Sequence, residues 1–370
     1  MNDNGAGSEL FREVDFATIW AVENKGIVFT APNVASVLEL PMPSPKAGEV
    51  LVRLTRSALS SGTERANLIG VPDGGVGIFA KDDGTVTWPR HCGYSSVGVI
   101  EALGAGVEGL CVGDRVALGW SKYALHQTIP VSRVYRLPES VSDAAAAFTH
   151  IATFPMAAVR KCRLEFGESA MVIGQGVLGQ LAIKILKAAG AVPLMAVDLK
   201  DEKRRQALKI GADCAFDPTA ADFVERVKSA AAGEGARMRG NVRDAGPRVV
   251  IEVTGSGKAL DEALDVVAPY GRIALLGCTR DSHFSIDYYH KVHGRGVTLV
   301  GAHTLARPEG ESAPGWWTER DDALAFVRML AHGRISCDDL VEETHGVEDA
   351  PEVFGRLARS ADFPTVQFTW

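Results

Sequence analysis

The sequence predicts an α/β protein that combines a mostly β domain with a doubly wound parallel-sheet domain. Three observations predict this class. Short β-rich runs separated by Gly and Pro fill the first third of the chain, strand-length apolar runs then alternate with helical segments, and a glycine-rich turn joins the first of these runs to a helix. At roughly 150 residues per domain, 370 residues are enough for two or three domains.

The mostly β region extends from about residue 19 to residue 134. Runs such as 48–54 and 97–103 have the apolar and β-branched content of strands and are bounded by turn residues. An Ala-rich stretch at 140–158 then predicts a helix. The change of pattern marks the end of the first β-rich segment.

The second region alternates between strands and helices. Helices are predicted at 177–189 and 201–210, and a surface loop at 233–248, where Gly and Arg interrupt the alternation. A further helix is predicted near 321–332, and we expect the apolar tail at 366–370 to return to the first domain. The apolar runs have the length of strands buried in a parallel sheet; they are 170–173, 191–197, 249–253, 273–276 and 297–300.

The charge balance argues against broad electrostatic partners. Lys and Arg total 39 against 46 Asp and Glu, which gives a net charge of -7 that is spread along the chain. We therefore expect neither nucleic acid nor an anionic membrane as a partner. Residues 1–9 lack the features of a signal peptide, no apolar run approaches the ~20 residues of a membrane span, and the six cysteines are scattered without a C-x-x-C pair. These features predict a cytoplasmic protein.

The most informative motif is the glycine-rich turn Gly174-Gln-Gly176-Val-Leu-Gly179. It directly follows a predicted strand and opens a predicted helix, which is the context that dinucleotide binding requires. Gly174 permits the tight turn, Gly176 lets a pyrophosphate approach the backbone, and Gly179 lets the helix pack on the strand. The pyrophosphate is expected at the helix N-terminus, beside Val177 and Leu178. The alternative is the same turn in a domain without a ligand.

An acidic residue follows this motif at the expected distance. Asp198 ends the next strand, 19 residues beyond Gly179, where its carboxylate can accept hydrogen bonds from the ribose hydroxyls. A carboxylate there repels a 2′-phosphate, so NAD is favoured over NADP. Lys200, Lys203 and Arg204 leave NADP open, because a basic cluster can hold a phosphate; Lys203 is included among the candidate cofactor residues.

These residues resemble the medium-chain dehydrogenase/reductase superfamily, which is alcohol dehydrogenase-like, over residues 26–368. The resemblance implies a GroES-like catalytic domain at residues 20–150 and 305–370, with a Rossmann dinucleotide-binding domain at 151–304 inserted between them. It also implies a small-molecule substrate in the cleft and a homodimer or homotetramer. Besides the glycine-rich turn, the stretches that carry it are 45–53, 98–107, 112–116 and 211–213.

The sequence departs from the family where zinc-dependent members keep their catalytic metal ligands. Ser61 stands in place of a cysteine, Tyr94 in place of a histidine, and Thr149 near the third ligand. Neutral hydroxyls do not build a tetrahedral zinc site, so we expect no zinc. The SSGTE and GYSS segments resemble a zinc-less branch of the superfamily. One alternative stays open, an unusual metal site made by Glu64, His91, Cys92 and His150.

Without zinc, hydroxyl and imidazole groups must carry the proton chemistry. Tyr94 is the first candidate for the acid, Thr63 matches a proton-relay position of the family, and His150 and His303 are candidates to orient the substrate or pass a proton. Ser61 and Thr149 are expected to line the substrate pocket. The resemblance also implies that the ends of two later strands contact the ribose and nicotinamide, through Thr254, Gly277 and Cys278.

The sequence therefore predicts an NAD(H)-dependent, zinc-independent oxidoreductase that interconverts a secondary alcohol and a ketone, on a sugar, cyclitol or polyol-like substrate. Two alternatives remain at this point. One is an NAD(P)H-dependent reductase of an activated alkene or quinone, which also needs no metal. The other is a non-catalytic dinucleotide-binding protein.

Overall fold

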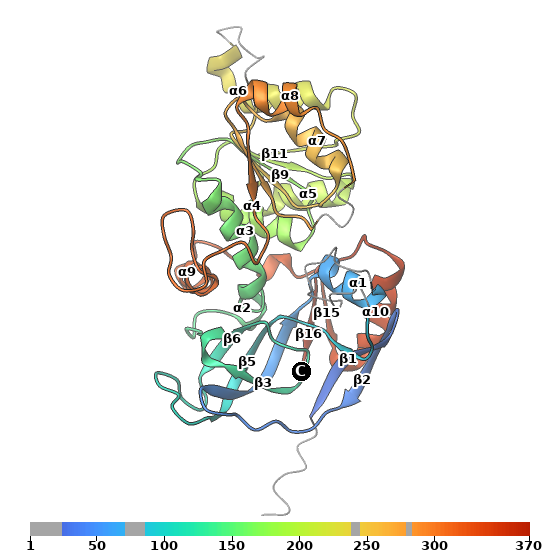
Figure 1. Cartoon of the computed structure of the whole chain (residues 1–370), viewed down its shortest axis with the longest axis vertical. Coiled ribbons are helices and arrows are strands. Elements are labelled where there is room, and N and C mark those ends of the chain that lie inside the picture. The colour runs from blue at the N-terminus through green and yellow to red at the C-terminus, as the bar shows by residue number, and fades with distance from the viewer. Residues whose placement is uncertain (1–23, 71–85, 238–244, 279–282) are drawn as a thin grey trace, which may run out of the picture.

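The computed structural model describes residues 24–70, 86–237, 245–278 and 283–370, and the signal-peptide prediction at residues 1–9 lies outside them. A parallel sheet with its helices forms one half of the molecule, and mostly antiparallel sheets form the other (Figure 1). The α/β class with a mostly β part is confirmed. The helices of this described part include none that is long and apolar enough to cross a membrane.

The parallel sheet has six strands in the order β11-β10-β9-β12-β13-β14. The chain starts at β9 and winds first to one side and then to the other, so the carboxyl end of β9 lies at the point where the winding reverses. Ligands of such sheets bind in the crevice at this end. Five of these strands agree with the predicted runs to within three residues, and β11 was not predicted. The strands are β9 (Ala170–Ile173), β10 (Leu194–Val197), β11 (Cys214–Phe216), β12 (Val249–Glu252), β13 (Arg272–Leu275) and β14 (Thr298–Gly301).

Helices cover both faces of this sheet because alternate strand residues point in opposite directions. Val172 of β9 packs in the core that includes α3, α4 and α9, whereas its neighbour Met171 packs in the core that includes α6 and α7. The helices are α3 (Thr149–Lys161), α4 (Val177–Ala188), α5 (Asp201–Ile210), α6 (Phe223–Arg237), α7 (Gly257–Val266), α8 (Tyr288–Lys291) and α9 (Glu319–Ala331).

Two sequence predictions in this region need correction. The loop predicted at 233–248 begins with helical residues, because α6 continues to Arg237; residues 238–244 lie outside the description. The single helix predicted at 140–158 is two helices, α2 (Asp143–Ala146) and α3. The hydroxyl of Ser142 caps α2 by accepting a hydrogen bond from the Ala145 N–H, which favours a separate short helix.

The β-rich half contains a seven-stranded sheet in which β15-β16-β3-β5-β6-β8 are neighbours and β7 pairs with β3, and a three-stranded sheet ordered β2-β1-β4. Phe368 of β16 pairs with Ser57 of β3, which confirms that the C-terminal tail returns to the first part of the chain. The strands are β1 (Lys25–Ala31), β2 (Val34–Glu39), β3 (Glu49–Ala58), β4 (Arg90–His91), β5 (Ser95–Leu103), β6 (Arg115–Gly119), β7 (His126–Pro130), β8 (Val134–Arg136), β15 (Glu343–Gly346) and β16 (Val366–Thr369).

Two further helices belong to this half, α1 (Ser61–Ile69) and α10 (Ala350–Arg359). Helix α3 connects the two halves: it packs against α4 and α9 and also against β5 and β6 (Figure 1). The domain boundary predicted at residue 150 falls within α3, and the boundaries themselves stay a prediction. The position of α3 matters because Thr149 and His150 form its first turn.

Candidate active site

The glycine-rich turn has the backbone geometry that a pyrophosphate site needs. Gly174 adopts a φ of 93°, which favours glycine. A Cβ on Gly179 would lie 1.9 Å from the carbonyl oxygen of Gly174, so only glycine allows this close packing. Gly176 is extended and precedes α4, and a Cβ there would meet nothing within 4 Å. The turn therefore leaves open space before the N-terminus of a 12-residue helix, beside Val177 and Leu178.

Asp198 is held beside this turn by two backbone hydrogen bonds. Its Oδ2 accepts from the Gln175 N–H at 2.8 Å and its Oδ1 from the Lys200 N–H at 2.9 Å. The nearby basic side chains have partners of their own. Lys203 Nζ lies 3.1 Å from Glu342 Oε2, and Arg204 donates to the carbonyl oxygens of Asp198 and Leu199. The carboxylate, and not the basic cluster, is the group that is held against the turn.

The ends of β12 and β13 lie close to the same turn. A Cβ on Gly174 would be 2.8 Å from Thr254 Cγ2, and one on Gly277 would be 2.1 Å from the backbone nitrogen of Gly255. Glu252 fixes this corner by accepting hydrogen bonds from the backbone N–H and the hydroxyl of Thr254. Cys278 follows Gly277 and is exposed. Thr254, Gly277 and Cys278 thus belong to one loop cluster with Gly174.

Tyr94 lies in the β-rich half with its side chain almost fully buried, 8% exposed. Its hydroxyl forms hydrogen bonds with the side chains of Ser60 and Thr63 at the start of α1. Burial raises the pKa of Tyr94 well above its usual range, and these hydrogen bonds only partly oppose the shift. Tyr94 is therefore protonated at neutral pH and can donate a hydrogen bond. The structure brings Tyr94 and Thr63 together and adds Ser60, which the sequence analysis missed.

Glu64, in the first turn of α1, lies near this cluster. Its Oε1 accepts a hydrogen bond from the Gly93 N–H at 2.8 Å, and its Oε2 is buried with no hydrogen-bond partner among the described residues. Burial raises the pKa of Glu64 to about 7, and the bond from Gly93 opposes this shift. Glu64 also raises the pKa of Tyr94 through its charge. Glu64 is thus a group that titrates near neutral pH inside the site.

His150 is completely buried, at 0% exposure, in a ring of aromatic side chains. Its imidazole centroid lies 4.7 Å from that of Trp120, 5.2 Å from that of Phe154 and 5.6 Å from that of Tyr94. Burial lowers the pKa of His150, so its imidazole is neutral at neutral pH. The structure thus places His150 in contact with Tyr94.

Glu319, the first residue of α9, also lies beside His150. Its Oε1 lies 3.3 Å from His150 Nδ1, and its Oε2 accepts a hydrogen bond from Trp120 Nε1 at 3.1 Å. Sequence analysis missed both Glu319 and Trp120. No sequence signal could have found them, because Glu319 lies 169 residues from His150 and meets it only through the packing of α9 on α3.

The remaining candidates lie at the edges of this arrangement. Ser61 is the partly exposed first residue of α1. Thr149 is buried, and its hydroxyl donates to the carbonyl oxygen of Ala146 at 2.7 Å. His303 follows β14, and its Nδ1 accepts a hydrogen bond from the Leu305 N–H at 3.2 Å. Nδ1 of His303 is therefore an acceptor, which places the proton of a neutral ring on Nε2.

The side chains at the zinc-ligand positions do not fit a catalytic zinc. Ser61, Tyr94 and Thr149 offer hydroxyls, and structural or catalytic zinc is held by His, Cys and carboxylate groups. Within the described ranges, no three His, Cys, Asp or Glu side chains gather in a way that could hold a metal ion. The unusual set is not assembled: the thiol of Cys92 donates to the Ile27 carbonyl oxygen at 3.3 Å, and Glu64 is bonded to Gly93.

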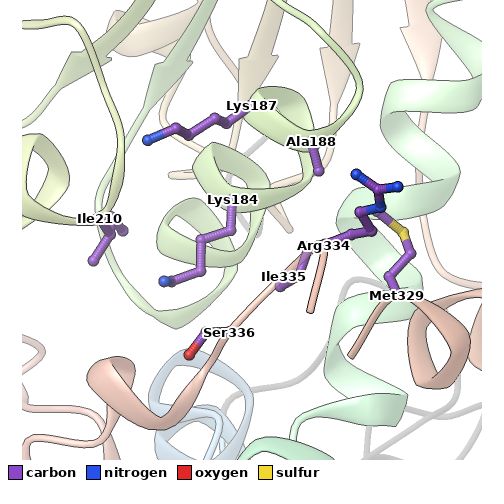
Figure 2. A pocket seen from close by; sticks show the side chains of 8 residues that line it. All are labelled: Lys184, Lys187, Ala188, Ile210, Met329, Arg334, Ile335 and Ser336. Atoms are coloured by element: carbon purple, nitrogen blue, oxygen red, sulfur yellow. The ribbon is translucent and has the colours of Figure 1, made fainter. Parts of the chain in front are cut away.

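A separate cavity of about 590 Å³ lies where the C-terminal ends of α4 and α5 approach the segment after α9 (Figure 2). Basic side chains near helix C-termini interact favourably with the negative end of the helix dipole. Lys184 is in addition paired with Asp339 at 2.8 Å. None of the candidate site residues lines this cavity, whose walls are Lys184, Lys187, Ala188, Ile210, Met329, Arg334, Ile335 and Ser336.

The chain is similar to known dehydrogenases. Residues 177–313 match the family described as zinc-binding dehydrogenase, a match that starts at α4 and does not include positions 61, 94 and 149. The D-guloside 3-dehydrogenase of Shigella flexneri is 26% identical over 89% of this chain and 95% of its own length. The L-threonine 3-dehydrogenase of Pyrococcus abyssi is 24% identical over 90% and 94%.

A solved structure shares the whole fold. The putative zinc-binding dehydrogenase of Sinorhizobium meliloti 1021, bound to NADP, has a TM-score of 0.76 at 19% identity and covers 94% of this chain and 99% of its own. The sheet order, the glycine-rich turn and these matches agree with one another. Residues 177–313 match the zinc-binding dehydrogenase family, and the chain as a whole is similar to alcohol dehydrogenase-like proteins of the medium-chain dehydrogenase/reductase superfamily.

Proposed function

We propose that this protein is an NAD(H)-dependent oxidoreductase that interconverts a secondary alcohol and a ketone without a catalytic zinc. The observation that carries this proposal is the cluster of Tyr94 with Ser60 and Thr63. By the resemblance stated above, Tyr94 stands at a metal-ligand position of zinc-dependent members. Cys278, at the end of the dinucleotide sheet, is near enough to Tyr94 that its thiolate would raise the pKa of Tyr94, so the cluster and the cofactor loops are close. The relative named D-guloside 3-dehydrogenase supports a sugar, cyclitol or polyol-like substrate.

The dinucleotide is proposed to bind along the carboxyl ends of β9, β10, β12 and β13. The backbone N–H groups at Val177 and Leu178 would meet the pyrophosphate, and Asp198 would accept hydrogen bonds from the ribose. When bound, the nicotinamide supplies a hydride acceptor or donor. Because Lys203 is paired with Glu342 and Arg204 bonds backbone carbonyls, these bases are engaged elsewhere, which supports NAD over NADP. The NADP in the Sinorhizobium meliloti structure belongs to that relative.

The chain's own groups can take over what zinc does for a substrate oxygen. Zinc stabilises the negative charge that develops on this oxygen. Tyr94 is protonated and can donate its hydrogen bond there, in a buried place where such a bond is strong. Ser60 and Thr63 hold the Tyr94 hydroxyl and keep it oriented. We also propose the domain limits given above, a homodimer or homotetramer, and a cytoplasmic location.

The test uses the purified full-length protein with NAD+ or NADP+ and a panel of sugars, cyclitols, polyols and enones, followed by nicotinamide absorbance. We expect alcohol oxidation that prefers NAD+. Tyr94→Phe should lower kcat/KM about 100-fold, since it removes one general acid. Tyr289→Phe, a matched change at an exposed tyrosine, should leave kcat/KM unchanged. Enone reduction without alcohol oxidation would favour the alkene or quinone reductase, and cofactor binding without turnover would favour the non-catalytic protein.

A further inference from the structure

We propose that Glu319 is a positioning residue that fixes the tautomer of His150, so that His150 accepts the proton released when the alcohol is oxidised. This inference rests on the proposed function. It starts from a chemical requirement: alcohol oxidation releases a proton, and Tyr94 cannot keep it, because Tyr94 is already protonated at neutral pH. A second group behind Tyr94 must therefore accept it.

His150 has the features of that acceptor. It is fully buried, and neither of its ring nitrogens makes a hydrogen bond of full geometry with a described residue. The two nitrogens differ in that Nδ1 lies 3.3 Å from Glu319 Oε1. A buried polar atom without a partner costs free energy and calls for an explanation. The imidazole meets the Tyr94 ring edge to face, with centroids 5.6 Å apart, so the two side chains are in contact. The proposed transfer requires the Tyr94 hydroxyl to exchange a hydrogen bond with Ser60 or Thr63 for one with Nε2. A free lone pair on Nε2 next to Tyr94 is what a proton acceptor needs.

Glu319 determines which ring nitrogen carries the proton of neutral His150. Nδ1 lies 3.3 Å from Glu319 Oε1, although the two atoms do not meet full hydrogen-bond geometry. Because an ionised carboxylate can only accept hydrogen bonds, this contact favours the tautomer in which Nδ1 carries the hydrogen and Nε2 is left as the acceptor. Trp120 Nε1 holds the other carboxylate oxygen at 3.1 Å. A Cβ on Gly119 would lie 3.0 Å from His150 Nδ1 and 3.4 Å from Glu319 Oε1, so the glycine leaves room for this contact.

The charges around the pair are consistent with these roles. Burial opposes ionisation of Glu319, but the contacts with His150, the Arg307 charge and the Trp120 hydrogen bond hold its pKa below the usual range. Around His150, burial lowers the pKa, Glu319 raises it, and Arg307 and Arg133 lower it. The phenols of Tyr94 and Tyr135 also face this region and are uncharged, since burial raises both of their pKa values.

The proposed step balances as follows. The substrate O–H bond breaks and its proton passes to the Tyr94 oxygen, while the Tyr94 proton passes to His150 Nε2. The carbinol C–H bond breaks with its electron pair, and the hydride goes to the oxidised dinucleotide that the proposed function supplies. The alcohol becomes a ketone, the dinucleotide is reduced, and Tyr94 ends as it began. The imidazolium that forms is stabilised by the Glu319 carboxylate.

The first test reads the tautomer without any turnover. In the full chain labelled with ¹⁵N-histidine and free of ligands, the signal of His150 is assigned by its loss in His150→Gln. We expect the Nδ1–H tautomer in the wild type. In Glu319→Gln the amide can donate to Nδ1, and we expect the Nε2–H tautomer. An Nε2–H tautomer in the wild type, or no change in Glu319→Gln, would overturn the inference even if the enzyme is fully active.

The second test reads the reaction. Glu319→Gln should lower kcat/KM for alcohol oxidation about 100-fold, because the acceptor is lost. Any remaining activity should have its acidic limb at lower pH, since the carboxylate no longer raises the pKa of His150. The matched control is Glu352→Gln, which removes an exposed carboxylate from the first turn of α10. Equal pH profiles for the two variants would contradict the inference.

A third variant keeps the test valid if Glu319→Gln does not fold. Trp120→Phe preserves a ring beside His150 but removes the hydrogen bond to Glu319 Oε2, and it should lower kcat/KM less than Glu319→Gln and in the same direction. An unchanged kcat/KM in Trp120→Phe would contradict the anchoring role. A wild type that oxidises no alcohol would refute the proposed function, and the tautomer measurement would still decide the Glu319 contact.

Discussion

Glu64→Gln should make the protein more stable, by an amount that grows with pH. Glu64 is fully buried, with its pKa raised to about 7 from 4.5. An acid whose folded pKa is raised favours the folded state only while it is protonated, so stability falls as pH rises from 4.5 to about 7. At about 1.4 kcal/mol for each pH unit between 4.5 and about 7, ionised Glu64 lowers the free energy of unfolding by about 3 kcal/mol above pH 7.

Glutamine keeps the shape and can still accept the hydrogen bond from the Gly93 N–H, but it cannot ionise. The variant and the wild type should therefore be about equally stable at pH 4, and the variant more stable by up to about 3 kcal/mol at pH 8. Urea unfolding with equal m values, measured at four pH values, gives the difference. Glu352→Gln serves as the control, because its exposed carboxylate should give no such trend. A difference between Glu64→Gln and the wild type that stays constant from pH 5 to pH 8 would refute the assigned titration.

Two predictions concern the cofactor. Asp198→Ala should lower kcat/KM with NAD+ about 10-fold, because it removes a hydrogen-bond acceptor for the ribose worth about 1.4 kcal/mol. It should also raise the ratio of kcat/KM with NADP+ to kcat/KM with NAD+, because it removes a negative charge that repels the 2′-phosphate. Steady-state kinetics with both cofactors measure these changes, and an unchanged ratio would show that Asp198 does not contact the ribose. Gly179→Ala should weaken NAD+ binding, measured by calorimetry, at least about 10-fold, because the new Cβ would lie 1.9 Å from the Gly174 carbonyl oxygen. The control is Gly310→Ala, which should bind NAD+ like the wild type because its Cβ would meet nothing within 4 Å. Equal affinities of the two alanine variants would contradict the loop assignment.

The sheet was predictable because its signals are local. The apolar run at 170–173, the glycine turn after it and the helix that follows lie within twenty residues, and each has its own physical reason. The end of α6 could not be predicted in this way. Gly233 and Gly235 indicate a loop, but the helix continues to Arg237. Tertiary packing can override such local preferences.

The proton groups of the site show a different limit. Tyr94 and Thr63 could be named because a family resemblance aligns them with known positions. Glu319 could not be named, because only the packing of α9 against α3 brings it to His150. Nor could the titration of Glu64 near pH 7 be foreseen, because it follows from burial with one unpartnered oxygen. Sequence patterns locate the scaffold, whereas burial and long-range contacts decide the protonation states.

The direction in which protons move separates the two enzymatic functions. Reduction of a ketone or of an activated alkene needs a group that gives up a proton, and the proposed role of Tyr94 would meet that need in either reaction. Oxidation of an alcohol also needs a group that takes a proton away. A neutral, buried histidine whose Nδ1 faces a carboxylate and whose Nε2 has no described partner has no use in one-way alkene reduction with Tyr94 as donor. The His150–Glu319 contact therefore favours the reversible alcohol–ketone reaction over reduction of an activated alkene.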